Sequence, residues 1–292
     1  MNHNLLTVLE RAKVHYQPIV DLNSGAIAGF EALMRTVDLD GNVASIGPFI
    51  EQIESDSALL DRLMRRLLCM IRHDAAPLFE RYPGFYISVN VPPAMLSAQT
   101  AFGESKIRGM LVEFDLIRYQ DRLVCEITER QALSAPGRAA LELARQNGIR
   151  LAMDDFGTGH SGIAQLLGLT VDVVKMDRSA VVLLTKDVTA ERLVRGIIAA
   201  TSLIRARVVA EGVESAAQAF FLQAAGVDYG QGWFWSPALP AAELPKVLEA
   251  GFPNWRSALV ERLNDARHSG ASRNPEQHKS PGLSRAGMTN LF

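Results

Sequence analysis

The stretch PGRAALELARQNGIRLAMDD, residues 136–155, contains the unit on which the fold prediction rests. Its first part, Pro136–Asn147, has the apolar spacing of an amphipathic helix, and Gly148 follows where a left-handed residue is expected after a helix end. The apolar run Arg150–Met153 then reads as a buried strand, and it ends in Asp154 and Asp155. A helix, a glycine, an apolar strand and an acidic strand end therefore follow one another without interruption.

The same alternation runs through most of the chain, and Gly226 is a second glycine just past a helical pattern. The other helical patterns are Phe49–Arg72, Ser105–Phe114, Ala190–Ile204, Ala216–Ala225 and Ala241–Ala250. The strand candidates are Val14–Val20, Ala26–Met34, Phe85–Val91, Leu123–Ile127, Arg150–Met153, Val171–Met176, Arg207–Ala210 and Val227–Tyr229. Strands that alternate with helices predict a parallel sheet, open or closed into a barrel.

The first two strand candidates break this pattern, because only Asp21–Gly25 separates them. Five residues are too few for the crossover helix that two parallel strands require, so these strands should pair antiparallel as a hairpin. A plain (β/α)8 barrel is therefore not the expected fold.

Length and charge narrow the possible functions. The chain has 292 residues, 48% of them hydrophobic, which suffices for one large barrel or two small domains. The net charge of −2 argues against binding to a long polyanion such as DNA or RNA, but not against a small nucleotide. Cys69 and Cys125 both lie in apolar stretches, so we expect two buried thiols rather than a disulfide.

The two ends of the chain suggest a cytoplasmic protein with a disordered tail. Glu10, Arg11 and Lys13 interrupt the N-terminal segment, which does not fit a secretory signal, and no apolar run is long enough for a membrane span. From about His268 onward, Ser, Gly, Asn, Pro, Gln and Lys dominate. We therefore expect one barrel domain over residues 1–255, followed by a helix end and a disordered tail over 256–292.

Polar residues recur where the apolar strands end. In an α/β barrel the carboxyl ends of the strands meet on one face, so residues far apart in sequence would share a pocket. Glu31 lies within the second strand candidate, and its side chain would point into the same pocket as the strand-end residues. The residues at or just past the strand ends are Asn90, Glu126, Asp154, Asp155, Lys175, Asp177, Glu211 and Gln231.

Such a pocket would contain more negative charge than Lys175 alone can neutralise, so one or two divalent cations are expected. Carboxylate and amide oxygens such as those of Asn90 suit Mg²⁺ or Mn²⁺ better than Zn²⁺. Two ions about 3.5–4 Å apart would favour metal-assisted hydrolysis of a phosphodiester. The negative charge of this pocket would come from five carboxylates, those of Glu31, Glu126, Asp154, Asp155 and Glu211.

Each of these positions also has a simpler interpretation. A single acid at a strand end is usually a solvated loop residue or a helix cap, Asp155–Gly159 has the composition of a turn, and Lys175 could lie on the surface. His160 is interpreted as a loop hydrogen-bonder rather than a metal ligand. Only the coincidence of many such positions on successive strands favours a shared site.

Taken together, the motifs resemble the EAL family of cyclic di-GMP phosphodiesterases, in order and spacing, from about Val14 to Ala250. They are Gln17-Pro18-Ile19, Glu31-Ala32-Leu33 with Arg35, Ser88-Val89-Asn90, Glu126-Ile127-Thr128-Glu129, Asp154-Asp155-Phe156-Gly157-Thr158-Gly159, Val174-Lys175-Met176-Asp177, Ala210-Glu211-Gly212-Val213-Glu214 and Gln231-Gly232. The resemblance implies a modified TIM-type (β/α)8 barrel with one antiparallel strand, which agrees with the short first connection.

The resemblance also implies an activity, the metal-dependent hydrolysis of cyclic di-GMP to linear pGpG with two-metal activation of water, and a role for each motif. Asp154 would bridge two ions, Mg²⁺ or Mn²⁺, Lys175 would position the attacking water, and Glu129 would anchor the loop after Asp155. The implied metal ligands are Glu31, Asn90, Glu126, Asp154 and Asp155; the other catalytic residues are Lys175, Glu211, Glu129 and Gln231; the substrate contacts are Gln17, Leu33, Arg35 and Asp177.

Every implied catalytic position carries the expected residue, which favours an active enzyme over a non-catalytic receptor of cyclic di-GMP. A lyase with Lys175 as a Schiff base is disfavoured, since surrounding carboxylates would raise the pKa of that amine. Departures from the family pattern occur at Thr36, Pro92, the 159–162 loop and Trp233–Pro237. Trp233 and Trp235 either belong to the core or border the guanine site, and we expect at least one to be core.

The family resemblance further implies a homodimer. Regulation, if present, is expected to act through dimerisation, a partner protein or the tail.

Overall fold

The computed structural model describes residues 2–38, 40–99, 105–128, 131–132, 134–157 and 170–271, with side chains described between residues 5 and 262. The predictions for Glu129, for His160 and for the tail beyond Ala271 lie outside the described residues.

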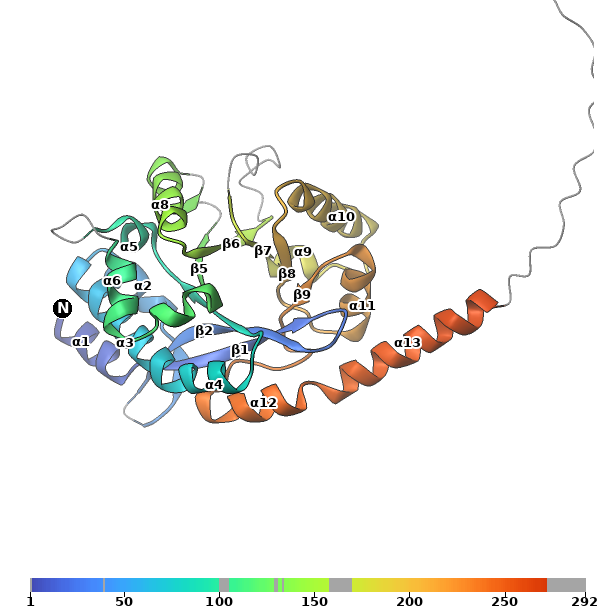
Figure 1. Ribbon diagram of the computed structural model, residues 1–292, viewed down its shortest axis with the longest axis horizontal. Helices are drawn as coiled ribbons and strands as arrows, with labels where there is room; N and C mark the ends of the chain where they lie inside the picture. The colour runs from blue at the N-terminus through green and yellow to red at the C-terminus, as the bar shows by residue number, and fades with distance from the viewer. Residues whose placement is uncertain are drawn as a thin grey trace, which may run out of the picture.

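Ten strands and a surrounding set of helices form the described part of the chain (Figure 1). The strands are β1 Lys13–Asp21, β2 Ile27–Val37, β3 Val43–Ser45, β4 Tyr86–Asn90, β5 Leu123–Thr128, β6 Arg150–Phe156, β7 Val173–Met176, β8 Arg207–Ala210, β9 Tyr229–Gly230 and β10 Leu239–Pro240. The α-helices are α1 Asn2–Arg11, α2 Gly47–Glu54, α3 Ser57–Asp74, α4 Ala76–Arg81, α5 Pro93–Ser97, α6 Lys106–Glu113, α8 Ala135–Gln146, α9 Arg178–Val181, α10 Val188–Leu203, α11 Ala216–Ala225, α12 Leu244–Ala250 and α13 Pro253–Ala271, and the 3-10 helices are η1 Ile117–Arg122 and η3 Ala241–Glu243.

Eight of the strands close into a barrel. Their order around the ring is β1-β9-β8-β7-β6-β5-β4-β2, and β2 pairs back with β1. The pairs from β2 round to β9 are parallel, whereas β1 is antiparallel to both of its neighbours. The prediction of a modified (β/α)8 barrel with one antiparallel strand is therefore confirmed, and the short strands β3 and β10 add to β2 and β1.

The predicted β1–β2 hairpin is built around Asp21. Its carboxylate accepts hydrogen bonds from the backbone N–H groups of Asn23 and Ser24 at 2.9 and 2.7 Å, and its own N–H donates to the carbonyl of Ala26. Aspartate favours such turns because its side chain can replace a backbone acceptor. This turn fixes a register in which Gln17 lies opposite Glu31.

The barrel interior is arranged in layers, because side chains along a strand alternate between the interior and the surrounding helices. One layer is apolar and contains Ile19, Tyr86, Val124, Ala152, Val173 and Val209. Two residues further toward the carboxyl end of each parallel strand, the inward positions become polar. That second layer contains Ser88, Glu126, Asp154, Lys175 and Glu211.

Two sequence predictions about the helices are wrong in detail. The pattern Phe49–Arg72 is two helices, since Asp56 caps α3 by accepting hydrogen bonds from the N–H groups of Ala58 and Leu59. Cys69 is exposed rather than buried, because α3 directs Leu67, Leu68 and Ile71 into the core and Cys69 away from it. Cys125 is buried as predicted, and both thiols are free.

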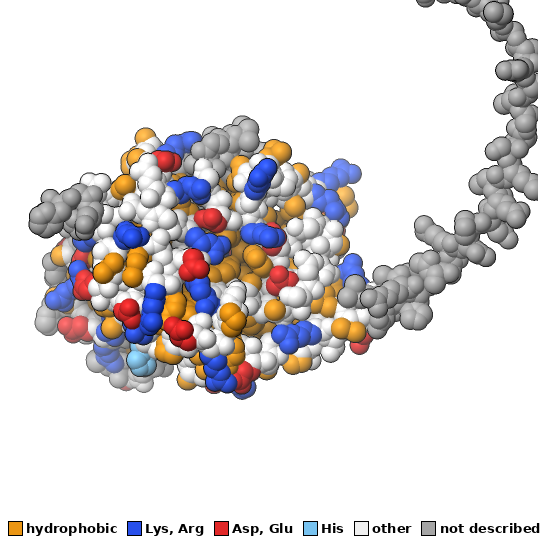
Figure 2. Space-filling view, viewed as in Figure 1, with side chains coloured by type: hydrophobic (Ala, Val, Ile, Leu, Met, Phe, Trp, Pro, Cys, Tyr) orange, Lys and Arg blue, Asp and Glu red, His pale blue; other side chains and the backbone are white. Residues whose placement is uncertain are grey.

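The outer surface mixes charges of both signs. Figure 2 shows Lys and Arg side chains interspersed with Asp and Glu side chains over the face seen in Figure 1. None of the helices in the described residues combines the length and apolar character that a bilayer crossing requires.

The two glycines predicted to end helices do so with left-handed backbones, Gly148 at φ +71° and Gly226 at φ +92°. A Cβ at Gly226 would have room, so Gly226→Ala isolates the backbone strain, and we expect it to lower the free energy of unfolding by about 1–2 kcal/mol. Gly109→Ala in the exposed middle of α6 also has room but no such strain, and it should instead stabilise by about 0.5–1 kcal/mol. Chemical denaturation of both variants measures the contrast, and effects of the same sign would contradict it.

Candidate active site

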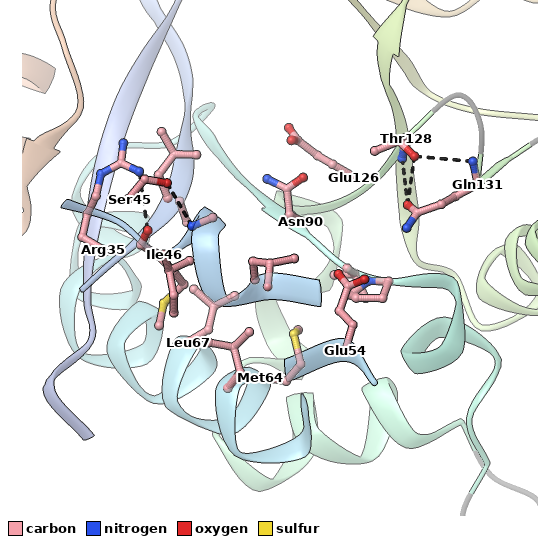
Figure 3. A pocket seen from close by; sticks show the side chains of 18 residues that line it. Arg35, Ser45, Ile46, Glu54, Met64, Leu67, Asn90, Glu126, Thr128 and Gln131 are labelled. Atoms are coloured by element: carbon pink, nitrogen blue, oxygen red, sulfur yellow. Dashed lines mark hydrogen bonds between the residues drawn. The ribbon is translucent and has the colours of Figure 1, made fainter. Parts of the chain in front are cut away.

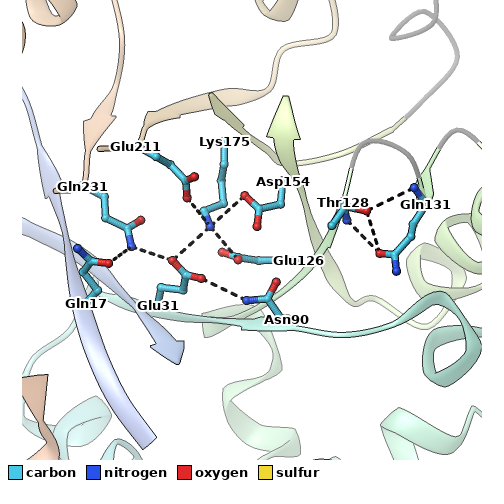
Figure 4. Close-up of polar contacts among 10 residues, drawn as sticks. All are labelled: Gln17, Glu31, Asn90, Glu126, Thr128, Gln131, Asp154, Lys175, Glu211 and Gln231. Atoms are coloured by element: carbon cyan, nitrogen blue, oxygen red, sulfur yellow. Dashed lines mark hydrogen bonds and ion pairs between the residues drawn. The ribbon is translucent and has the colours of Figure 1, made fainter. Parts of the chain in front are cut away.

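The polar strand ends predicted from the sequence converge around one lysine (Figure 4). The Nζ atom of Lys175 on β7 lies 2.7 Å from Glu211 Oε1, 2.9 Å from Glu126 Oε2, 3.2 Å from Asp154 Oδ1 and 3.3 Å from Glu31 Oε2. These carboxylates come from the second, fifth and sixth strands and from the residue after β8. Five carboxylates were predicted to share a pocket with Lys175. The structure places four of them within hydrogen-bond or ion-pair distance of its ammonium group.

The charge state of Lys175 follows from these neighbours. Its side chain is only 2% exposed, and burial by itself would lower the pKa of the amine. The four carboxylates outweigh burial and raise the pKa of Lys175 well above its ordinary value. Lys175 is thus an ammonium group at neutral pH, which argues against a Schiff-base lyase.

One ammonium group does not compensate four carboxylates, and their pKa values diverge. Burial, together with the charges of Glu31 and Asp154, raises the pKa of Glu126 well above its ordinary value despite Lys175. Burial also raises the pKa of Glu211, to about 8. Burial would raise the pKa of Glu31 too, but Lys175 and hydrogen bonds from Gln231 and Asn90 lower it.

Amide side chains hold Glu31 in place. Gln231 Nε2 donates to Glu31 Oε2 at 2.7 Å, and Asn90 Nδ2 donates to Glu31 Oε1 at 3.2 Å. Gln231 Nε2 also lies 3.1 Å from Gln17 Oε1, which accepts a hydrogen bond across the barrel closure. The predicted residues Gln17, Asn90 and Gln231 therefore belong to one network with Glu31.

An irregularity in β6 places Asp155 beside Asp154. Consecutive side chains of a regular strand point to opposite faces. Here the register with β7 shifts between Met153 and Phe156, and Asp155 has a left-handed backbone with φ +57°. As a result Asp154, Asp155 and Glu211 each offer a carboxylate oxygen within 4.8 Å of the others.

The donors in this cluster fit a divalent cation. Glu126 Oε1 is buried and has no hydrogen-bond donor among the described residues, and the buried Asp154 Oδ1 has only the ammonium group of Lys175, at 3.2 Å. Buried carboxylate oxygens with so few partners are costly unless a cation or water satisfies them. All the ligand atoms on offer are carboxylate or amide oxygens, the type preferred by Mg²⁺ and Mn²⁺. The residues that could hold a metal are Glu31, Asn90, Glu126, Asp154, Asp155 and Glu211.

Two cavities flank the cluster, and Leu33 lines both. The first has a volume of about 370 Å³ and extends from Asn90 and Glu126 over the apolar residues of α2 and α3 (Figure 3). Arg35 lies at its edge, partly buried, and forms no ion pair among the described residues. A partly buried guanidinium without a carboxylate partner is suited to a phosphate oxygen.

The second cavity, of about 300 Å³, lies on the opposite side of the cluster, toward β8 and β9. Gln17, Glu31, Asp154 and Glu211 contribute to its wall, so it opens directly onto the carboxylates. Its remaining residues are Leu33, Arg178, Gly212, Glu214, Gln231, Gly232 and Trp233.

Not every predicted residue joins the cluster. Asp177 lines neither cavity, and its carboxylate caps α9 by accepting a hydrogen bond from Ser179 N–H at 2.8 Å. Asp177 nevertheless acts on the site through charge, since burial, Asp154 and Asp177 together raise the pKa of Asp155. Sequence reasoning missed Glu54 and Arg178 as cavity residues, because a Glu in an amphipathic helix and an Arg after a strand carry no distinctive signal.

The model of the EAL domain family matches residues 5–238 of this chain. Several curated proteins of Escherichia coli (strain K12) are similar to it. A probable cyclic di-GMP phosphodiesterase, PdeB, is 33% identical over 252 residues, covering 85% of this chain and 47% of that protein. The cyclic di-GMP phosphodiesterase PdeR is 29% identical over 267 residues, covering 90% of this chain and 38% of that protein. This chain thus spans about half the length, or less, of the curated relatives it matches.

Many solved structures share the fold. The EAL enzyme Bd1971 bound to cAMP and cyclic di-GMP superposes with a TM-score of 0.74 at 26% identity, over 85% of this chain and 67% of that one. The PaMucR phosphodiesterase in complex with c-di-GMP gives a TM-score of 0.72 at 27% identity, over 83% of this chain and 98% of that one.

The raised pKa of Glu211 predicts a pH dependence of stability without metal. The folded protein keeps a proton on Glu211 at pH values where the unfolded chain has lost it. Protonation of Glu211 therefore contributes to the free energy of unfolding at low pH, and this contribution is lost as the pH rises toward about 8. In chelator, we expect the free energy of unfolding to fall by about 1 kcal/mol or more between about pH 5 and pH 8, and Glu211→Gln to flatten that slope. Glu142→Gln, on the exposed side of α8, is the control; equal slopes for both variants would refute the assignment.

Proposed function

Because this chain belongs to the EAL domain family, we propose that it hydrolyses cyclic di-GMP to the linear dinucleotide pGpG. The observation that carries the proposal is the buried Lys175 ammonium surrounded by four carboxylates, with an open cavity on either side. The names of the similar proteins support the substrate. The reaction adds water to phosphorus and breaks one bond from phosphorus to a ribose 3′ oxygen.

We assign the metal sites from the oxygen donors. Glu31, Asn90, Glu126 and Asp154 would hold one ion, and Asp154, Asp155 and Glu211 would hold a second, with Asp154 shared and Mg²⁺ or Mn²⁺ as the ions. When bound, the ions would lower the pKa of the attacking water and neutralise charge on the phosphoryl oxygens. This assignment accounts for the crowding of carboxylates that Lys175 alone does not neutralise.

Lys175 would orient the attacking water rather than deprotonate it. An ammonium group has only donors, and the carboxylates keep Lys175 in that form. Glu211, within 2.7 Å of Lys175 and 20% exposed at the second cavity, would accept a hydrogen bond from the same water. Gln231 would keep Glu31 aligned through its 2.7 Å hydrogen bond.

The two cavities suit a cyclic dinucleotide that places one of its two phosphodiesters between them and one base on each side. The scissile phosphate would lie over the cluster, with Leu33 beneath it because Leu33 lines both cavities. Arg35 would bind a phosphate oxygen, and Gln17 would contact the substrate from the wall of the second cavity. A substrate role for Asp177 and an anchoring role for Glu129 remain predictions, as do a homodimer, a regulatory partner and the cytoplasmic location.

Turnover tests the proposal directly. Purified protein with cyclic di-GMP and Mg²⁺ or Mn²⁺ should produce pGpG, and Glu31→Gln should lower kcat/KM at least about 100-fold, because it replaces an anionic metal ligand with a neutral one. Excess chelator should abolish the reaction, while Glu142→Gln should retain it. Chromatography of the nucleotides provides the measurement. Tight binding without turnover would instead identify a receptor, and neither binding nor turnover in the folded, metal-loaded protein would overturn the proposal.

The second metal site is tested by counting ions. Asp155→Asn should reduce the number of Mn²⁺ ions bound per chain from about two to about one, since the first site does not use Asp155. Asp115→Asn is a matched control, because Asp115 is also an exposed aspartate with a left-handed backbone, at φ +53°, but lies outside both cavities. Metal titration of the two variants measures the stoichiometry, and an unchanged count for Asp155→Asn would remove Asp155 from the ligand set.

A further inference from the structure

Trp233 is an exposed aromatic side chain at the candidate active site. It is 71% exposed, whereas Trp235 and Trp255 are 9% and 1% exposed. Trp235, Phe234 and Trp255 pack against one another with ring centroids 5.1–6.0 Å apart, and no ring pair among the described residues includes Trp233. The sequence left open whether each of Trp233 and Trp235 belongs to the core or borders the guanine site. Trp235 belongs to the core, and Trp233 does not.

The backbone holds Trp233 at the rim of the second cavity. On one side Val213 N–H donates to Gln231 O at 3.0 Å, and on the other Phe234 N–H donates to Val213 O at 3.0 Å. Gly232 between them lies so close that a Cβ atom there would be 2.1 Å from Val213 O. The backbone that carries the indole is thus fixed, although the ring itself contributes little to the core.

The guanidinium of Arg178 lies over the indole ring and is itself held in place. Its guanidinium carbon is 5.8 Å from the Trp233 ring centroid, and its Nη2 donates to Glu214 Oε1 at 2.6 Å. The aliphatic part of Arg178 lies against Gly212, where a Cβ atom would be 2.2 Å from Arg178 Cγ. Trp233 and Arg178 therefore line the same wall of the cavity that opens onto Glu31, Asp154 and Glu211.

We propose that Trp233 is a stacking platform for one purine base of the substrate, which would stack on the part of the exposed indole that the Arg178 guanidinium does not cover. An exposed indole face is a poor choice for a surface in water but a strong one for a nucleobase, and base stacking on an aromatic ring is worth enough to matter for affinity. The inference rests on the proposed function, since it requires a cyclic dinucleotide whose phosphate lies over the cluster. It assigns the second cavity to a purine and makes Trp233 a substrate-binding residue.

Steady-state kinetics of Trp233→Ala test the platform. The KM for cyclic di-GMP should rise at least about fivefold, because stacking of a base is lost, whereas kcat should stay within about twofold. Inorganic phosphate serves as a probe without a base; we expect it to compete with the substrate at the cluster and to keep the same inhibition constant in this variant. Trp233→Phe should retain most of the affinity, since a ring remains.

Leu203→Ala provides the matched control, because Leu203 at the end of α10 is also 71% exposed and lines neither cavity. It should leave both constants unchanged. An unchanged KM in Trp233→Ala, with wild-type protein active, would overturn the platform and leave the proposed function intact. Parallel losses in kcat and phosphate inhibition would also overturn it, by showing that Trp233 supports the cluster. If the wild-type protein neither binds nor hydrolyses cyclic di-GMP, the proposed function fails and this inference with it.

Discussion

A single buried ammonium group surrounded by four carboxylates is the constraint on which the rest of this structure depends. Charges removed from water are costly unless each has a partner, and Lys175 is the one cation among the described residues that lies within ion-pair distance of Glu31, Glu126, Asp154 and Glu211. The arrangement stays under-compensated, as the raised pKa values of Glu126 and Glu211 show. A centre with this imbalance is suited to binding cations.

The barrel makes this concentration of charge tolerable by separating it from the core. The inward side chains form an apolar layer at one level and the charged layer two residues further along each strand. The apolar layer excludes water from below, and the helices around the ring bury the outward residues. The charged groups are thus supported from beneath by rigid strands, while their upper side opens to two cavities. Rigid support of this kind keeps ligand atoms in place before any ion binds.

The two cavities differ in a way that suits two ends of one substrate. The first is walled by apolar residues of α2 and α3, and Arg35 contributes its cation. The second is walled by the polar cluster itself and by the exposed indole of Trp233. If the proposed substrate binds, recognition of a two-fold symmetric cyclic dinucleotide by two unlike cavities would position one of its two phosphodiesters over the carboxylates, without requiring symmetry in the protein.

The sequence by itself determined the barrel and most of the site, because both follow from local periodicity. Alternating strands and helices, the five-residue Asp21–Gly25 turn and the polar residue at each strand end are visible in the chain, and parallel strands must bring their carboxyl ends together. Only the tertiary structure decided the features that depend on contacts between distant segments. The bulge that turns Asp155 toward Asp154, the outward face of Cys69, and the burial of Trp235 beside an exposed Trp233 are set by packing and register, which no local pattern encodes. The charge state of Lys175 belongs between these two cases: its neighbours were predictable, but how far they outweigh burial depends on distances that only the folded barrel fixes.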